Sequence, residues 1–368
     1  MKRPEKLAWP QFSRHTDRLV LDILHSGRVN YWTGDVGRRF ERTFADWLGV
    51  PEAMSVGSGT TALHLALAAL GVGAGDEVVV TPYSFRASAT CAANAGAKMV
   101  FADVAGDHLL SAEGIARVLT PRTKAVVVVH LFGQVADLGP IVRLCRARKL
   151  FLVEDCAQCL GGEYRGRKVG TVGDAGCFSF CQSKHITTGG EGGMVVCRSR
   201  RVRAAVRSLR DHGWVVGTSP KTYDRIGFNA RLTELQSAVG LGELARLETW
   251  NLPRRRRLAE ELVKGLAGHP LVEGLPVDTP ARRASFWLVP FVIRTERLKG
   301  SFGAFVDRLQ REGAGAYKVL WPLMAAKPTA TRLFGRTVGF WVHPTRTLAE
   351  IHRDVAIFRK VAEAFDAG

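Results

Sequence analysis

The chain has 368 residues, of which 46% are hydrophobic and 23% are charged. This length suits a large α/β domain with a smaller appendage, and the composition is too apolar for a disordered chain. No apolar run approaches the roughly 20 residues that span a bilayer. No apolar block follows the charged start of the chain, as it would in a secretory signal. We therefore expect a cytoplasmic protein with no membrane partner.

The formal net charge of +18 is compatible with nucleic acid, a membrane surface or a small anionic substrate as the partner. The one dense basic cluster is the run of four arginines at 254–257, at the start of a predicted helix. No zinc-finger or recognition-helix motif lies beside it. We interpret the cluster as a solvated face, with an anionic nucleotide or diphosphate substrate as a second reason for the charge, and we expect no nucleic-acid partner.

Seven cysteines are scattered along the chain. An odd number without regular spacing is typical of reduced thiols in a cytosolic protein, not of a disulfide framework. Cys156 and Cys159 form a C-x-x-C motif, but a zinc site needs a second ligand pair, and the sequence has no other C-x-x-C. We interpret the cysteines as small buried hydrophobic residues and expect no metal.

Residues 1–50 are predicted to form helices interrupted by a loop at 26–34. Between 55 and about 200, short apolar runs alternate with longer segments of helical periodicity. The expected strands lie at 78–80, 99–101, 125–129 and 151–153, and the expected helices at 60–70, 86–95, 111–119 and 138–148. This alternation is typical of βαβ units and predicts an α/β fold with a mainly parallel central sheet between helices.

The segment 232–248 has leucine and valine at helical spacing and is predicted to lead into a second domain. Beyond about 250 we expect helices packed on a small sheet that includes 285–294. The chain is therefore predicted to consist of a large domain at 1–248 and a smaller C-terminal α+β domain at 249–368.

The segment 57–63, Gly-Ser-Gly-Thr-Thr-Ala-Leu, is a hydroxyl-rich turn that opens into a predicted helix. Glycines allow a close backbone approach, and the free N–H groups at a helix start attract an anion. Thr60 and Thr61 add hydroxyl donors. Because serine and threonine also cap helices for structural reasons alone, this turn by itself leaves a phosphate site and a simple cap open.

Two carboxylates, Glu154 and Asp155, follow the strand predicted at 151–153. A buried acid is costly unless a cation or a strong donor meets it, and a protonated pyridine nitrogen is such a partner. A cap of a helix that begins near Cys156 is an equally good structural interpretation of Asp155.

Lys184 ends the apolar stretch 177–184 and precedes a glycine-rich segment. Desolvation lowers the pKa of such a lysine toward the free amine that an imine requires.

Nine short motifs occur together in an order that is specific jointly, although each is weak alone. They lie at 32–34, 40–41, 57–63, 75–78, 130–134, 154–158, 178–184, 190–193 and 229–236. On these motifs the first 245 or so residues resemble the sugar aminotransferases of the DegT/DnrJ/EryC1/StrS family. That family belongs to the fold-type I enzymes, so the resemblance implies a fold-type I α/β structure and pyridoxal 5′-phosphate (PLP) as the cofactor.

The resemblance also implies roles for particular residues. The match to Lys184 forms the Schiff base and acts as the catalytic base, and the match to Asp155 pairs with the ring nitrogen. Gln158 matches the residue that bonds the phenolic oxygen, and Phe85 matches an aromatic that stacks on the ring. The remaining matches contact the cofactor phosphate: Thr60, Thr61 and Ser179 from the same subunit, and Asn229 from the other subunit of a homodimer with shared active sites.

The implied reaction transfers an amino group from glutamate or glutamine to a keto-sugar, in the first place a nucleotide-linked one. Two alternatives share the fold: a keto-cyclitol aminotransferase of aminoglycoside-type biosynthesis, and a PLP-dependent sugar dehydratase. Family dehydratases carry histidine at the lysine position, whereas this chain reads Lys184-His185 before Ile-Thr-Thr, which favours transamination. A nucleic-acid-binding or regulatory protein whose enzyme fold has lost its catalytic activity is a further alternative. Retention of Lys184, Asp155 and Gln158 argues against it.

Overall fold

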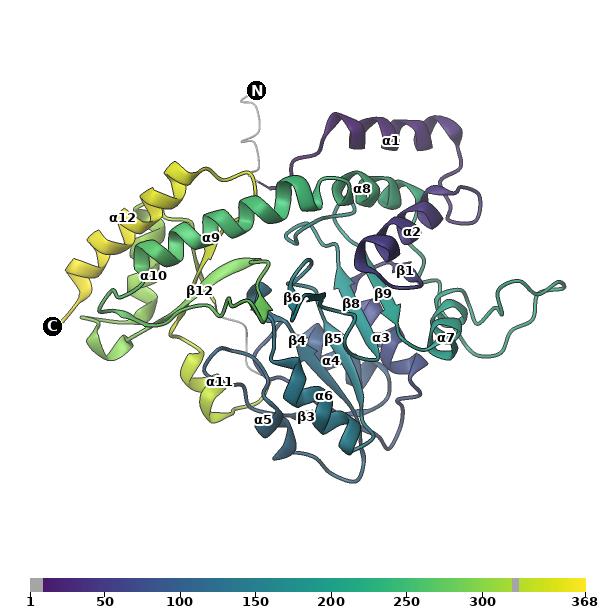
Figure 1. Ribbon diagram of the computed structural model, residues 1–368, viewed down its shortest axis with the longest axis horizontal. Coiled ribbons are helices and arrows are strands. Elements are labelled where there is room, and N and C mark those ends of the chain that lie inside the picture. The colour runs from purple at the N-terminus through teal and green to yellow at the C-terminus, as the bar shows by residue number, and fades with distance from the viewer. Residues whose placement is uncertain (1–8, 320–323) are drawn as a thin grey trace.

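A computed structural model describes residues 9–319 and 324–368. A seven-stranded sheet with the order β1-β9-β8-β5-β4-β2-β3 lies at the centre of the larger part of the molecule (Figure 1). Its strands are β1 Ala53–Val56, β2 Glu77–Val80, β3 Lys98–Phe101, β4 Thr123–Val129, β5 Phe151–Asp155, β8 Ala175–Ser179 and β9 Gly193–Cys197. The five strands from β8 to β3 run parallel, and β9 runs antiparallel to both neighbours. The predicted mainly parallel sheet is confirmed.

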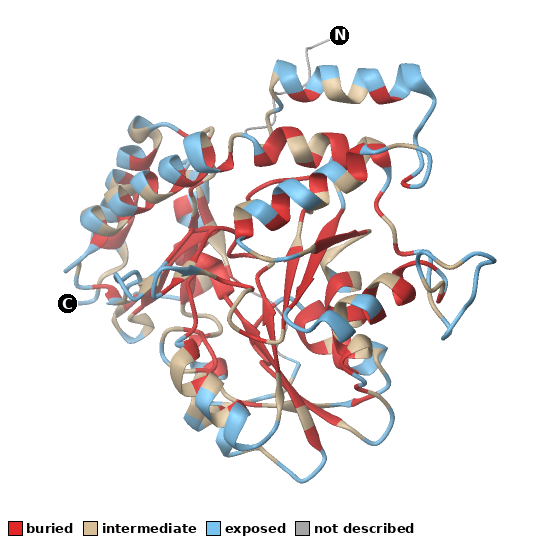
Figure 2. Ribbon diagram, turned by 45° about the vertical axis from the view of Figure 1, so that its right-hand side comes forward, coloured by how far each residue is buried: buried red, intermediate tan, exposed pale blue. Residues whose placement is uncertain are grey.

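Both faces of this sheet are buried (Figure 2), which explains the near-continuous apolar runs of its strands. Because side chains alternate along a strand, Val126 and Val128 of β4 join one hydrophobic cluster, while Ala125 and Val127 join another. Helices complete the two layers: α3 Gly59–Ala69, α4 Ala87–Asn94, α5 Ala112–Ala116, α6 Leu138–Ala147 and α7 Arg200–Arg210.

One helix differs from its predicted length. The helix expected at 111–119 is only five residues long, as α5. It begins after Ser111, whose side chain accepts a hydrogen bond from the Gly114 amide at 3.1 Å. The glycine inside the helix and Pro121 shortly after it both oppose helix continuation. The expectation from the periodicity of the apolar residues therefore overestimated the length of this helix.

The N-terminal helices α1 Arg14–Ser26 and α2 Val36–Leu48 pack against α8 Glu234–Leu244 (Figure 1). Thr233 and Gln236 form a capping box that starts α8. The Glu234 carboxylate then accepts hydrogen bonds from the Val36 and Gly37 amides at 2.7 and 2.9 Å. One charged side chain thus fixes the start of α2 on the start of α8.

The C-terminal part contains a four-stranded sheet of order β10-β12-β14-β13 and a hydrophobic cluster of its own. Its strands are β10 Val272–Gly274, β12 Leu288–Ile293, β13 Ala316–Lys318 and β14 Thr337–Trp341. Its helices are α9 Leu252–Leu266, α10 Phe302–Arg311, α11 Pro328–Leu333 and α12 Leu348–Phe365. The expected small sheet with a strand inside 285–294 is present as β12. The boundary between residues 248 and 249 stays a prediction.

Two of the contacts that join the C-terminal part to the larger part of the molecule are made by backbone pairing. A small sheet pairs β11 Arg282–Arg283 with the hairpin of β6 Glu163–Tyr164 and β7 Arg167–Lys168. The short 3-10 turn η1, Leu131–Gly133, also pairs with the segment that leads into β12. There the Ser285 amide donates to the Gly133 carbonyl and the Trp287 amide to the Phe132 carbonyl, both at 2.9 Å.

The structure corrects the interpretation of the arginine cluster as a solvated face for Arg255, whereas Arg254 and Arg257 are exposed as expected. Arg255 is fully buried, and its Nε donates to Oδ1 of Asn251 at 2.7 Å. Its Nη1 donates to the Phe286 carbonyl at 3.3 Å. Burial lowers the pKa of Arg255 to about 9. The cluster begins an amphipathic helix, α9, so one of four consecutive arginines necessarily faces inward.

No helix in the two described stretches has the length and apolar character that a membrane span requires.

Candidate active site

A pocket of about 450 Å³ lies at the carboxyl ends of β5 and β8, beside the first turn of α3. This is the edge at which open parallel sheets bind ligands. Six of the predicted site residues line it: Thr60, Phe85, Asp155, Gln158, Ser179 and Lys184. An aromatic wall from the C-terminal part also lines it, formed by Trp287, Tyr317 and Trp341.

Lys184 lies in a turn after β8, where its amide donates to the Cys181 carbonyl at 2.9 Å. Its Nζ lies 4.7 Å from the centre of the Trp287 ring. Burial lowers the pKa of Lys184, and the charges of Asp155, Cys181 and Glu191 oppose this effect without cancelling it. A lysine with a lowered pKa carries more free amine near neutral pH, the form that attacks a carbonyl carbon.

Asp155 ends β5 and is almost fully buried. Its Oδ2 accepts a hydrogen bond from the Ser88 hydroxyl at 2.7 Å, and its Oδ1 accepts one from the Ala157 amide at 3.0 Å. Burial raises the pKa of this carboxyl, and the two donors only partly offset that effect. A cation in the pocket would stabilise the charged form, so the site fits a protonated pyridine nitrogen. The alternative of a helix cap is wrong, because Cys156 is followed by turns.

Gln158 is buried, and its side chain has a fixed orientation. Its Oε1 accepts a hydrogen bond from the Phe132 amide at 2.9 Å. Phe132 has a φ of 62°, an uncommon backbone conformation for a bulky side chain that the turn η1 imposes. With Oε1 engaged, the amide nitrogen of Gln158 is the atom that can donate to a ligand oxygen.

The first turn of α3 supplies the anion-binding end of the pocket. Ser58 caps the helix by accepting a hydrogen bond from the Thr61 amide at 3.1 Å, and its hydroxyl lies 2.9 Å from the Thr61 hydroxyl. Gly59 passes so close to Ser179 that a Cβ at position 59 would lie 2.7 Å from the Ser179 Cβ. Thr60 is exposed and lines the pocket. The turn is therefore both a cap and a place where a phosphate fits.

Two predicted residues, Thr61 and Asn229, lie outside the pocket lining. Thr61 is engaged by the Ser58 side chain. Asn229 is exposed and forms a β-bridge with Asp211. Phe85 does line the pocket, with 55% of its surface exposed. Roles for Thr61 and Asn229 in phosphate binding stay predictions.

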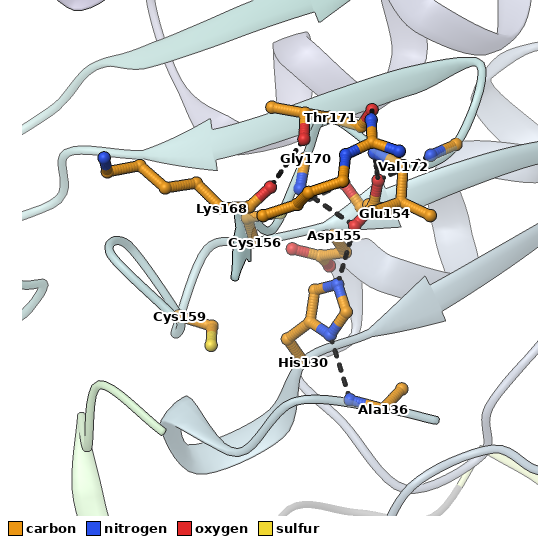
Figure 3. A network of polar contacts seen from close by, with 12 residues as sticks. His130, Ala136, Glu154, Asp155, Cys156, Cys159, Lys168, Gly170, Thr171 and Val172 are labelled. Carbon is orange, nitrogen blue, oxygen red and sulfur yellow. Dashed lines mark hydrogen bonds and ion pairs between the residues drawn. The ribbon is translucent and has the colours of Figure 1, made fainter. Parts of the chain in front are cut away.

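A buried network lies beside Asp155 (Figure 3). Nδ1 of His130 accepts from the Ala136 amide at 3.1 Å, so Nε2 carries the proton and donates to Glu154 at 3.1 Å. The Glu154 carboxylate also accepts from three backbone amides at 2.7–2.8 Å, those of Gly170, Val172 and Gly173. Burial acts to raise the pKa of Glu154, but these donors outweigh it and lower the pKa. Glu154 thus holds the loop before β8.

The C-x-x-C motif has no free thiolate. Cys156 and Cys159 are buried and unpaired, and burial raises the pKa of Cys156 well above its usual value and that of Cys159 to about 12. The Cys159 thiol donates to the Gly133 carbonyl at 3.3 Å. His130, Glu154 and Cys156 lie close enough together to suggest metal ligands, but the hydrogen bonds just described engage the His130 and Glu154 atoms.

Sequence reasoning missed the aromatic wall and Ser88. Trp287 and Trp341 lie more than 100 residues after Lys184, and only the fold brings them to the pocket. The Trp287 indole N–H donates to the Ser183 carbonyl at 2.7 Å, which ties the wall to the lysine loop. The one available signal was the predicted sheet segment 285–294, which contains Trp287.

The model of the DegT/DnrJ/EryC1/StrS aminotransferase family matches residues 11–345. The chain is 36% identical to GDP-perosamine synthase of Vibrio cholerae over 293 residues, which are 78% of this chain and 77% of that protein. It is 41% identical to L-glutamine:2-deoxy-scyllo-inosose aminotransferase of Streptomyces fradiae over 276 residues, 71% of this chain and 64% of that protein.

Among solved structures, an aminotransferase from Psychrobacter cryohalolentis superposes with a TM-score of 0.91 at 32% identity. The match covers 97% of this chain and 98% of that one. These similarities agree with a pocket that presents a half-buried lysine, a buried aspartate and a helix start together. The chain therefore belongs to the DegT/DnrJ/EryC1/StrS family of PLP-dependent sugar aminotransferases.

Proposed function

We propose that the enzyme transfers the amino group of glutamate or glutamine to a nucleotide-linked keto-sugar. The meeting of Lys184, Asp155 and Gln158 in one pocket carries this proposal. A GDP-perosamine synthase is among the similar proteins and supports a nucleotide-linked acceptor. The excess of positive charge suits an anionic substrate.

The residues present fit PLP. Lys184 would hold the cofactor aldehyde as a Schiff base, Asp155 the ring nitrogen and Gln158 the phenolic oxygen, while Thr60, Ser179 and the start of α3 would hold the phosphate. Bound there, the cofactor supplies an electron sink for the charge that develops when a C–H bond breaks. Lys184 would be the base that moves a proton between carbon atoms of the substrate and cofactor. Asp155 would keep the ring nitrogen protonated.

The aromatic wall is the proposed acceptor side of the pocket. Trp287 and Trp341 meet edge to face with ring centres 5.2 Å apart. The ring centre of Tyr317 lies 5.4 Å from that of Trp341. Such a wall offers apolar surface to the C–H faces of a sugar ring and excludes water from the lysine. A keto-cyclitol is the second candidate acceptor, because it presents similar faces and a similar protein acts on 2-deoxy-scyllo-inosose.

The geometry argues against the dehydratase alternative. Lys184 lines the pocket, whereas the neighbouring His185 does not. His185 is buried, and its Nε2 lies 3.3 Å from the Ser285 carbonyl oxygen. The histidine next to the lysine therefore has no place at the reacting atoms.

We further propose a homodimer whose active sites are shared. The loop between α7 and α8 extends from the body of the subunit (Figure 1). It exposes apolar side chains that water disfavours, including Tyr223, Ile226 and Phe228 at 61%, 92% and 44% of their surface. Asn229 lies in this loop, directly after Phe228. A second copy that covered these side chains would receive Asn229 near its own cofactor phosphate.

A substrate panel tests the proposal. Purified enzyme with PLP would be assayed for glutamate- and glutamine-dependent amination of nucleotide-linked keto-sugars and of keto-inositols, with the aminated product identified by mass spectrometry. We expect turnover of a nucleotide-linked keto-sugar. Exclusive turnover of a keto-inositol would show that the acceptor is a keto-cyclitol, the second candidate. Dehydration without amino transfer would contradict transamination.

A further inference from the structure

A second large hollow lies outside the active site, and we call it the basic groove. Its volume is about 840 Å³. Its cationic lining consists of Arg143, Arg146, Arg165, Arg167, Lys168 and Arg198. We propose that the basic groove binds a small anion carrying linked phosphate groups, of the size of a nucleoside diphosphate.

The basic groove lies at the end of the central sheet away from the active site. Phe151 begins β5 and lines a hollow that shares Arg146 and Arg198 with the groove, whereas Asp155 ends β5 inside the active site. Gly173, just before β8, lines the groove. Among the described residues, none lines both the groove and the active-site pocket. A ligand in the groove would leave the reacting atoms untouched.

The positive charge of the groove lacks internal compensation. Asp46 is the one carboxylate among its lining residues. None of the five arginines forms an ion pair with another residue in the described part of the chain, and Lys168 has only a 3.9 Å contact with Glu248. Some arginines elsewhere are paired: Arg203 and Arg207, for example, both form ion pairs with Glu52. Because these cations line one hollow, an anion there would be stabilised.

Neutral contacts hold several of these side chains in place without cancelling their charge. The Arg165 guanidinium lies 5.4 Å from the centre of the Tyr164 ring, and Arg167 donates to the Thr171 carbonyl at 2.5 Å. Lys168 lies 5.1 Å from the centre of the Trp47 ring. Cations ordered before binding lose less entropy when a ligand arrives. Planar guanidinium groups also match phosphate oxygens two at a time.

The shape of the groove selects the class of anion. Its volume falls within the range of sites for small molecules, about 300–1,000 Å³. Its walls come from α6, the β6–β7 hairpin with the loop 170–173, the segment 46–51 at the end of α2, and the end of β9 with Arg198, and they form a concavity instead of a flat or convex face. A concavity suits a discrete molecule better than a membrane surface. The inference does not depend on which sugar the active site aminates.

Inorganic pyrophosphate is the probe for this site. The PLP-loaded enzyme would be titrated with pyrophosphate by calorimetry at 0.15 M salt, with PLP bound so that the active-site phosphate position is filled. The test variant is Arg146→Glu/Arg198→Glu, which reverses the charge of two exposed side chains. Both line the basic groove and also the neighbouring hollow at Phe151. The control is Arg311→Glu/Arg353→Glu, which makes the same change in net charge at exposed positions of α10 and α12.

We expect one pyrophosphate per subunit, an affinity at least about tenfold weaker in the test variant, and wild-type affinity in the control. Both variants should keep the wild-type kcat. No binding to the wild type, or an equal loss in both variants, would refute a built site in the groove. Affinity that rises steadily with the length of a single-stranded RNA would instead assign the groove to nucleic acid.

Discussion

The Ser88 hydroxyl donates a hydrogen bond of 2.7 Å to Oδ2 of Asp155, 67 residues away in sequence. Ser88 lies on α4 and Asp155 at the end of β5. This bond and the Ala157 amide fix both carboxylate oxygens in a buried place where burial raises the pKa. Ser88 is therefore a positioning residue for the acid that would pair with the cofactor ring.

Replacement of Ser88 should weaken cofactor binding. Ser88→Ala removes a hydrogen bond to a charged group, and we expect the affinity for PLP to fall about tenfold or more. Ser88→Thr keeps a hydroxyl and is the matched control. PLP would be titrated into the cofactor-free protein and followed by absorbance, with the unfolding temperature measured alongside. Equal affinities for wild type and Ser88→Ala would show that the bond does not position Asp155.

Lys184 should be the single attachment point of the cofactor. Lys184→Ala removes the amine that forms the Schiff base and moves the proton, so amino transfer should fall at least about a thousandfold. The visible absorbance of the Schiff base should disappear even where PLP still binds. Borohydride reduction of the wild type, followed by peptide mapping, should locate PLP on Lys184. A label on another lysine would contradict the assignment.

The proposed shared site can be tested by mixing two inactive variants. Asn229→Asp would place a carboxylate against the partner's cofactor phosphate, and like charges at short range repel each other. The homodimers of Asn229→Asp and of Lys184→Ala should both be nearly inactive. In a mixed dimer, one site carries both defects and the other carries neither.

Co-refolding the two variants should therefore restore about half of the wild-type activity per mixed dimer. Tagged subunits and tandem purification would establish that mixed dimers form. If purified mixed dimers stay as inactive as their parents, then Asn229 does not act across the interface.

Glu243 should make the fold less stable as the pH rises. Burial raises its pKa to about 7, against the opposing effect of Arg246. Because the folded protein holds the proton more tightly than the unfolded chain, stability is fully present below about pH 4.5 and is lost as the pH rises through 7. The loss amounts to at most about 3 kcal/mol. Glu243→Gln should raise the unfolding temperature at pH 8 and have little effect at pH 5. A gain that is equal at both pH values would exclude titration of Glu243.

Local patterns in the first 200 residues were enough to predict four adjacent strands of the central sheet, β2, β3, β4 and β5, but not β1, β8 and β9. Short apolar runs that alternate with helical segments indicate buried parallel strands, because each parallel connection requires a crossover. The same patterns placed Asp155 at a strand end and Thr60 at a helix start. These predictions succeeded because each depends on a few adjacent residues.

Features that depend on contacts between residues far apart in the chain could not be predicted from the sequence. Trp287 and Trp341 reach the pocket only through pairing of β12 with β14 and attachment of that sheet to η1. Arg255 was interpreted as solvated because four consecutive arginines do not reveal which one turns inward. Ser88 had no signal, because a serine inside a predicted helix is unremarkable until a carboxylate is found beside it.

The pairing of Phe132 with Trp287 has a consequence for how the enzyme can move. The Phe132 amide bonds Gln158 on the cofactor side, while its carbonyl accepts from the Trp287 amide on the acceptor side. The two peptide groups that flank Phe132 therefore link the cofactor side of the pocket to its acceptor side. Any rotation that separated the aromatic wall from the lysine would have to break this backbone link first. Substrate entry should therefore depend on loops at the rim, while the distance between the two halves stays constant through the catalytic cycle.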